Sequence, residues 1–287
     1  MSLIPNGFDP LVDGMFNPLP DILDDWSVLN QWATHLTKRQ RKDQLRIVHW
    51  FYDLPFQETA RSKSAVPELS REEVLDTFVG RDVKGSGMYF TPLEMAGNVV
   101  DCLDAIVWQG GKILEPCAGI GSLIAPIEGD KHIVAYDVCE TNVALGSRLF
   151  PEVEWRWSIP FRDVDALSGQ FDVVLMNPPY NIKRGIGPGI EMSQGRATKS
   201  EHLFLELAVR SVKPGGQIVI IAPYNFWDKM PGHLRVWVNE RVLLEDSWGP
   251  LPGEFSMTKI AAHLFVVRKR GVRESDVGNN CVQMWLW

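Results

Sequence analysis

Short apolar runs separated by longer mixed stretches organise most of this chain. The apolar runs predict strands at Lys112–Leu123, where the run passes into a glycine turn, and at His132–Asp137, Val153–Ile159 and Phe171–Met176. Stretches with helical character separate these runs, and strands that alternate with helices form a mainly parallel sheet with helices on both faces. The pattern therefore predicts an α/β fold with a doubly wound sheet from residue 85 onwards.

The chain before this region has a different character. Residues 1 to about 20 are rich in Pro, Gly and Asn, which predicts an extended segment, and residues 21–84 predict helices. One helix is expected from about Leu23 to Tyr52, and a capping box at Ser70–Glu73 predicts the start of a second, short helix. The predicted organisation is an N-terminal extended and helical segment (1–84), an α/β domain (85–270) and a C-terminal tail (271–287).

Small residues gather in the turn after the first strand. Ala118, Gly119 and Gly121 allow the backbone to approach a ligand closely, and a helix expected to start here offers free N–H groups. Ile124 stands where the dinucleotide-binding fingerprint has its third glycine, and the Gly-Lys-Ser/Thr ending of the phosphate loop is absent. The turn therefore predicts a nucleotide site whose ligand is not a pyrophosphate.

Acidic residues follow the next two strands. Asp137 ends the second strand about 20 residues beyond the glycines, where doubly wound folds place a carboxylate on ribose hydroxyls. After the third strand, both Asp163 and Asp165 are candidates to accept a hydrogen bond from an adenine amino group, and we favour Asp165. Val138 and Ala166, which follow the two chosen acids, are expected in the same pocket.

The sequence Asn177-Pro178-Pro179-Tyr180 comes directly after the fourth strand. A planar amino group is a poor nucleophile because its lone pair is delocalised, and acceptors on its two N–H bonds favour tetrahedral geometry and free the pair. The Asn177 side-chain oxygen and the Pro178 carbonyl are suitable acceptors, because the two prolines fix φ and remove competing donors. Tyr180 offers a face for stacking. The motif predicts methylation of an amino group, and its alternative is a Pro-rich turn that closes a strand.

With these motifs in this order, the chain resembles the class I S-adenosylmethionine-dependent methyltransferases, and within them the gamma class of DNA adenine-N6 methyltransferases. Gly87–Pro92 resembles the family's G-x-(Y/F)-(Y/F)-T-P element, Glu115–Gly119 resembles its first cofactor loop, and Asn177–Tyr180 matches its catalytic tetrad. The resemblance covers roughly residues 85–270, and the order of the motifs is more specific than any one motif.

The later part of the domain also resembles this family. The resemblance implies a helix that ends in Lys213–Gly216, a strand Gln217–Pro223, and Gly253-Glu254-Phe255 ahead of a strand Ile260–Val267. It implies a Rossmann-like, doubly wound sheet of seven mostly parallel strands, of which the last is antiparallel.

The resemblance further implies a cofactor, a reaction and site residues. The implied cofactor is S-adenosyl-L-methionine, with Thr91 at its methionine part and Glu115 near its amino group. The implied reaction is methyl transfer to the N6 amino group of adenine in DNA, as in restriction-modification, and an aromatic ring at the Phe255 position stacks on the flipped adenine opposite Tyr180. The expected cofactor-binding residues are Thr91, Glu115, Pro116, Ala118, Gly119, Gly121, Asp137, Val138, Asp165, Ala166 and Asn177.

Composition narrows the class of protein. A chain of 287 residues with 45% hydrophobic residues is able to bury a full α/β core. Because it contains no run of about 18 apolar residues and no charged-then-apolar leader, neither a membrane span nor a secretory signal is expected. The four cysteines lack paired metal spacing, so no metal site and a reducing cytoplasm are expected, and Cys117 is interpreted as a small loop residue.

The charge distribution bears on nucleic-acid binding. A net charge of −7 argues against a surface covered in phosphate contacts but allows a local basic face. We interpret the basic stretch Lys38–Lys42 with Arg46 as a solvated helix face, with a DNA contact as the alternative. The Gly-rich loop 181–200, which carries Lys183 and Arg184 and leaves the catalytic strand directly, is better placed to close over a substrate.

The sequence leaves alternatives open for the segment that selects the target and for the substrate. Only Gly271–Trp287 follows the last expected strand, so we expect target choice to come from the N-terminal segment, the 181–200 loop, a specificity subunit or a homodimer, or to be weak. The same tetrad chemistry serves RNA adenine or a protein glutamine, and a third alternative is an inactive binding protein on the same fold. The intact tetrad, glycine loop and Asp137 argue against inactivity, and Phe255 favours a base over an amide.

Overall fold

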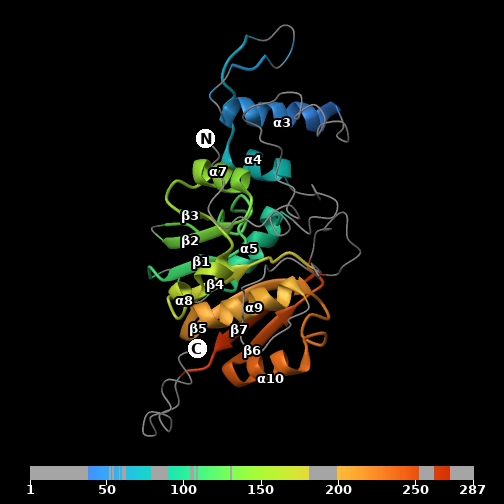
Figure 1. Ribbon diagram of the computed structural model, residues 1–287. Coiled ribbons are helices and arrows are strands. Elements are labelled where there is room, and N and C mark those ends of the chain that lie inside the picture. The colour runs from blue at the N-terminus through green and yellow to red at the C-terminus, as the bar shows by residue number, and fades with distance from the viewer. Residues whose placement is uncertain are drawn as a thin grey trace.

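The centre of the computed structural model is a seven-stranded sheet with the strand order β3-β2-β1-β4-β5-β7-β6 (Figure 1). The structure describes residues 38–51, 53, 55–57, 59, 63–78, 90–103, 107, 109–129, 131–180, 199–251 and 262–271. The strands are β1 (Lys112–Glu115), β2 (His132–Asp137), β3 (Glu154–Trp157), β4 (Phe171–Met176), β5 (Val212–Pro223), β6 (Val242–Trp248) and β7 (Ala262–Lys269).

Strand directions in this sheet confirm the predicted fold class. Strands β1 to β5 pair in parallel, and β7 runs antiparallel between β5 and β6. The predicted runs His132–Asp137 and Phe171–Met176 coincide with β2 and β4, while β3 occupies only the middle of its predicted run. The sheet is therefore doubly wound and mostly parallel, with its last strand antiparallel.

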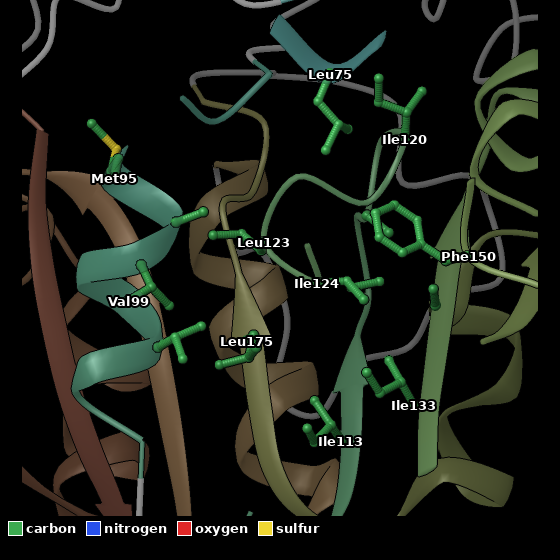
Figure 2. Close-up of a cluster of buried hydrophobic side chains, with 14 of the residues drawn as sticks. Leu75, Met95, Val99, Ile113, Ile120, Leu123, Ile124, Ile133, Phe150 and Leu175 are labelled. Atoms are coloured by element: carbon green, nitrogen blue, oxygen red, sulfur yellow. The ribbon is translucent and has the colours of Figure 1, made fainter. Parts of the chain in front are cut away.

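Two hydrophobic cores cover the two faces of the sheet. Because side chains alternate along a strand, Ile113 and Leu175 enter one core while Leu114 and Met176 enter the other. The first core includes residues of α4 (Arg71–Phe78), α5 (Leu93–Asp101) and α7 (Glu140–Leu149), and the second includes residues of α8 (Val164–Leu167), α9 (Ser200–Ser211) and α10 (Gly232–Arg241). Figure 2 shows the first core, where the helix that carries Met95 and Val99 lies beside Leu123 and Leu175.

Two predicted boundaries are wrong. The helix implied to end in Lys213–Gly216 ends at Ser211, and the following residues belong to β5. The strand starts early because Val212 pairs with Phe171, after which the register shifts, and Gly215 adopts a φ of +79° there. A left-handed conformation of this kind is accessible to glycine at little cost.

The helix expected to start in the glycine turn is also absent from the described structure. Residues 116–117 and 119–126 form turns and not a helix, because Gly119 and Gly121 have φ values of +57° and +94°, which do not fit a right-handed helix. The Gly121 N–H donates to the Ala118 carbonyl at 2.9 Å, and the Ile124 N–H donates to the Gly121 carbonyl at 3.0 Å. The backbone in this loop is therefore held by turn hydrogen bonds, not presented as a helix N-terminus.

The predicted capping box is confirmed at the start of α4. The Ser70 N–H donates to the Glu73 carboxylate at 2.9 Å, and the Glu73 N–H donates to Ser70 Oγ at 3.1 Å. These two bonds satisfy N–H groups that the first turn of a helix leaves without partners.

One arginine of the sheet domain binds the C-terminal end of the helix that the structure describes in the N-terminal segment. Within the helix predicted for Leu23–Tyr52, the structure describes α3 (Lys38–Phe51). Arg148 of α7 donates to the carbonyls of Trp50 and Phe51, at 2.8 and 3.0 Å, and pairs with Asp53 at 2.7 Å. Its guanidinium also lies 4.6 Å from the centre of the Trp50 ring.

Candidate active site

The expected site residues converge on one edge of the sheet. The strand order reverses between β1 and β4, and in open α/β sheets ligands bind outside the carboxyl ends of the strands at this point. Glu115 ends β1, Asp137 ends β2, and Asn177 directly follows β4. The topology therefore brings together residues that lie more than sixty positions apart, counting from 115 to 177.

Asp137 fastens the glycine loop to the end of β2. Its Oδ2 accepts from the Gly119 N–H at 2.8 Å, and its Oδ1 accepts from the Cys139 N–H at 2.8 Å and from Asn142 Nδ2 at 3.2 Å. Burial raises the pKa of Asp137 to about 6, although these donors act in the opposite direction. Asn142 was not identified from the sequence as a partner of Asp137. The feature that could have indicated it is its position five residues after the acid, in the first turn of α7.

Glu115 is a buried acid whose second oxygen is unsatisfied. The side chain is 2% exposed, and Oε2 has no hydrogen-bond partner within the described structure. Burial, and to a lesser degree the neighbouring Asp137, raise the pKa of Glu115 well above its usual value. A buried acceptor without a donor is costly, so this position fits a ligand that brings a cationic donor.

Cys117 lies between the glycine loop and the tetrad. Burial raises the pKa of its thiol well above the usual value, with contributions from Glu115 and Asp137, while a backbone hydrogen bond from Asn177 acts in the opposite direction. The thiol is therefore protonated at neutral pH, and a protonated thiol is a poor nucleophile. This environment supports its interpretation as a small loop residue.

The Asn177 amide is held from both ends. Its Nδ2 donates to Thr91 Oγ1 at 3.0 Å, and its Oδ1 accepts from the Tyr180 hydroxyl. The Tyr180 hydroxyl also lies 3.1 Å from the Ile221 carbonyl on β5. Thr91 is buried just before α5, and the ring of its neighbour Phe90 packs against Gly119. The structure thus brings the T-P element, the glycine loop and the tetrad into contact.

Tyr180 has little exposed surface in this conformation. Its side chain is 6% exposed, with its hydroxyl turned toward Asn177 and Ile221. The tetrad backbone is held by Ser200 at the start of α9, whose hydroxyl donates to the Pro179 carbonyl. Sequence reasoning did not single out Ser200, which ends the loop that leaves the tetrad.

The two acids after β3 have different surroundings. Asp163 accepts from the Tyr136 hydroxyl at 2.9 Å, and Arg156 donates to the same hydroxyl at 2.6 Å. Asp165 and Ala166 are exposed on the short helix α8. Asp163 is therefore occupied by its hydrogen bond to the buried Tyr136, whereas Asp165 is exposed. The assignment of Asp165 to the adenine amino group stays a prediction. Val138 is half-buried, and its carbonyl accepts from Trp157 Nε1 at 3.0 Å.

Several expected site residues lie outside the described residues. They are Gly87, Phe255 and the 181–198 part of the loop after the tetrad. Among the aromatic side chains that are described, Tyr224 is 62% exposed at the carboxyl end of β5, beside the strand that carries the tetrad. Among the residues that the structure covers, no group of His, Cys, Asp and Glu has an arrangement that holds a metal ion, and no helix is long and apolar enough to cross a membrane.

This fold and site resemble those of the S-adenosylmethionine-dependent methyltransferases. The chain superimposes with a TM-score of 0.59 on a protein from Listeria monocytogenes assigned to class I of these enzymes, at 15% identity over 92% of this chain and 90% of that one. At this identity, the likeness concerns the fold.

Sequence comparison is more specific. Residues 142–245 match the model of the Eco57I restriction-modification methylase family. The chain is 22% identical over 234 residues to the methylase subunit of the type I restriction enzyme HindI from Haemophilus influenzae, which covers 72% of this chain and 52% of that subunit. It is 23% identical over 184 residues to the rRNA N(6)-adenosine-methyltransferase metl-5 of Caenorhabditis elegans, covering 60% and 80% of the two chains.

These matches confirm the resemblance to S-adenosylmethionine-dependent methyltransferases that the motifs predicted. The chain spans about half the length of the Haemophilus subunit. The family match contains the segment from α7 to β6, and so includes the tetrad. The boundaries predicted at residues 84 and 270 stay predictions.

Proposed function

We propose that this protein transfers a methyl group from S-adenosyl-L-methionine to the N6 amino group of adenine in DNA. The observation that carries the proposal is the Asn177 amide, which is fixed at the carboxyl end of β4 by Thr91 and Tyr180. An amide held in this way, followed by Pro178 and its carbonyl, provides two acceptors for one planar amino group. The match of residues 142–245 to a restriction-modification methylase family supports DNA as the substrate, and the rRNA N(6)-adenosine-methyltransferase among the relatives supports the adenine amino group.

The cofactor pocket is proposed to lie beside this amide. The unsatisfied, buried Glu115 Oε2 fits the cationic amino group of the methionine part. Asp137, placed by its bonds to the glycine loop, is proposed to accept from the ribose hydroxyls, and Asp165 from the adenine amino group. Gly119 allows the loop to pack closely on the T-P element, because a Cβ there would lie 3.3 Å from the Phe90 ring.

We propose that further residues of the loops and strand ends also contact the cofactor. When bound, S-adenosyl-L-methionine supplies a methyl group activated by its sulfonium charge. The loop and strand ends that would surround it are Thr91, Glu115, Pro116, Ala118, Gly119, Gly121, Asp137, Val138, Asp165, Ala166 and Asn177.

The protein's own part in the reaction is to prepare the amino group. The Asn177 oxygen and the Pro178 carbonyl would accept hydrogen bonds from its two N–H groups and so direct the nitrogen lone pair at the methyl group. S-adenosylhomocysteine would be the leaving group, and the methylated nitrogen would lose one proton to water. These acceptors matter most when charge develops on the nitrogen, which is in the transition state. We propose Pro179 and Tyr180 as the supports of this geometry, and Phe255 as a stacking partner of the base.

RNA adenine is the second candidate substrate, because the Caenorhabditis relative is an rRNA N(6)-adenosine-methyltransferase. DNA is preferred because the family match and the Haemophilus relative both belong to restriction-modification methylases. We also propose a specificity subunit as partner, by analogy with the type I subunit, with a homodimer as the alternative, and a cytoplasmic location.

The test is methylation with isotope-labelled cofactor on unmethylated duplex DNA, single-stranded DNA and ribosomal RNA, followed by mass spectrometry of the nucleosides. We expect labelled N6-methyladenine in DNA from the wild type. The Asn177→Ala variant should retain cofactor binding and lose about 10²–10³ in rate. Label only in RNA would establish the second candidate, and label in neither nucleic acid from a cofactor-bound protein would refute the proposal.

A further inference from the structure

We infer that Thr91 is a positioning residue for the catalytic amide, and that Tyr180 is its counterpart on the other side. The inference rests on the proposed function and adds to it how the Asn177 oxygen is directed at the substrate. The observations are three hydrogen bonds in one buried row: Asn177 Nδ2 to Thr91 Oγ1 at 3.0 Å, Tyr180 hydroxyl to Asn177 Oδ1, and Tyr180 hydroxyl to the Ile221 carbonyl at 3.1 Å.

Thr91 decides which end of the amide faces the substrate. A side-chain amide has one end that only accepts and one end that only donates, and the two have nearly the same shape. Thr91 Oγ1 accepts from Asn177 Nδ2, so the donor end is occupied and the acceptor end is directed away from Thr91. The reverse orientation would present N–H groups to an amino group that itself carries N–H groups, and this is repulsive.

Thr91 is itself held rigidly, so it is able to impose this orientation. Its side chain is 4% exposed, and it lies between Phe90, which packs on the glycine loop, and Pro92, which caps α5. The Thr91 hydroxyl has one proton, and accepting from Asn177 leaves that proton to donate elsewhere. A cofactor group that accepts it would strengthen the bond to Asn177, because hydrogen bonds in a chain polarise one another.

The Tyr180 hydroxyl holds the acceptor end of the amide and has two acceptors within reach. A phenol has a single O–H, yet the Tyr180 hydroxyl lies within bonding distance of both Asn177 Oδ1 and the Ile221 carbonyl. Without substrate, the hydrogen bond that the Tyr180 hydroxyl donates to Oδ1 keeps this oxygen in place. When a substrate N–H reaches Oδ1, the Tyr180 proton is able to turn to Ile221, which frees a lone pair without leaving the phenol unbonded.

The test uses variants that change the hydroxyls and little else. Thr91→Val keeps the shape of threonine, Thr91→Ser keeps the hydroxyl, and Tyr180→Phe keeps the ring. At saturating cofactor, we expect Thr91→Val and Tyr180→Phe each to lower kcat by about 3- to 10-fold, which corresponds to the loss of one hydrogen bond. Thr91→Ser should restore kcat, and melting temperatures of all variants show that they remain folded.

Dependence on Asn177 separates positioning from a structural role. If both hydroxyls act through the amide, then adding Thr91→Val or Tyr180→Phe to the Asn177→Ala variant leaves its residual kcat unchanged. If either substitution lowers kcat by the same factor with and without Asn177, the inference is wrong. A change in cofactor affinity that is equal in both backgrounds reports only on the contact of Thr91 with the cofactor.

A second measurement does not need the substrate. The side-chain amide resonances of Asn177 are identified in a ¹⁵N spectrum by their loss in Asn177→Ala. We expect their hydrogen exchange to be slow in the wild type and in Thr91→Ser, and faster in Thr91→Val. Equal exchange in Thr91→Val would overturn the inference. If the wild type methylates no nucleic acid, the proposed function fails while this spectrum still decides the role of Thr91.

Discussion

Replacing Glu115 should make the protein more stable and its cofactor site weaker. The Glu115→Met variant has a similar length, no charge and no acceptor, at a position that is 2% exposed and where Oε2 has no partner within the described structure. Leaving a buried polar group unsatisfied costs about 1–3 kcal/mol. We therefore expect the free energy of unfolding of the cofactor-free protein to rise by about this amount.

The effect should depend on pH in a defined direction. The pKa of Glu115 is raised well above 4.5 in the folded protein, so the folded state binds this proton more tightly than the unfolded state. The wild type therefore loses stability as the pH rises above the unfolded value. Because Glu115→Met has no such proton, its advantage should be small at low pH and should grow as the pH increases.

Cofactor should reduce the stability advantage of the variant. We expect S-adenosylhomocysteine to bind Glu115→Met about 10- to 100-fold more weakly, since hydrogen bonds to a charged group contribute about 1.5–3 kcal/mol. A ligand at 100 times its wild-type Kd stabilises the wild type by about 2.7 kcal/mol and this variant by only about 0.4–1.4 kcal/mol. The ligand should therefore raise the melting temperature of the wild type more than that of the variant, and so offset most of the advantage that the variant has without ligand.

A matched control separates burial from net charge. Glu152→Gln also removes one negative charge, but at a side chain that is 53% exposed and paired with Arg71. This variant should change neither the melting temperature by more than about 2 °C nor the affinity for S-adenosylhomocysteine, because exposed ion pairs contribute about 0–1 kcal/mol. If Glu115→Met melts lower than the wild type without ligand and binds S-adenosylhomocysteine normally, our reasoning about the buried acid is wrong.

Three further predictions concern Asp137 at the glycine loop, Gly146 on α7, and the contact of Arg148 with the N-terminal segment. Because the pKa of Asp137 is raised to about 6, the affinity for S-adenosylhomocysteine should increase as the pH rises through about 6 and the carboxylate becomes ionised; calorimetry should find this part of the increase missing in Asp137→Asn. Gly146→Ala should destabilise the protein by about 1–3 kcal/mol in urea titrations, although alanine favours helices, because the new Cβ would lie 2.3 Å from the Trp155 ring; a more stable variant would contradict the packing around α7. Arg148→Met should remove the bonds to Trp50, Phe51 and Asp53, so limited proteolysis should cut near residue 53 at least several times faster; an unchanged cleavage pattern would show that α3 is held by other contacts.

Local chemistry in the sequence was sufficient for much of the fold. The runs 132–137 and 171–176 predict β2 and β4 at their observed bounds, because a strand buried on both faces is apolar throughout and ends at polar or Gly/Pro residues. The capping box at Ser70 was readable because its two hydrogen bonds involve residues only three apart. The prolines of the tetrad likewise restrict their own backbone wherever they are placed.

Other features depended on contacts between distant segments. The residues after Ser211 resemble a helix end, but they join β5 because Val212 finds a partner in Phe171 across the sheet. The glycine loop does not begin a helix, because Asp137 binds the Gly119 N–H from a different strand and two glycines adopt positive φ. Neither outcome is visible within a short window of sequence.

The site shows the same division. Residue type and position after a strand indicated Asn177 and Asp137, and the resemblance to methyltransferases implied Glu115. That Thr91 and Tyr180 hold the Asn177 amide, and that Glu115 Oε2 lacks a partner in the described structure, was decided only by the tertiary structure. The physical reason is that a side chain's chemistry is a property of its residue, whereas its orientation and its pKa depend on which groups folding places within about 3–6 Å of it.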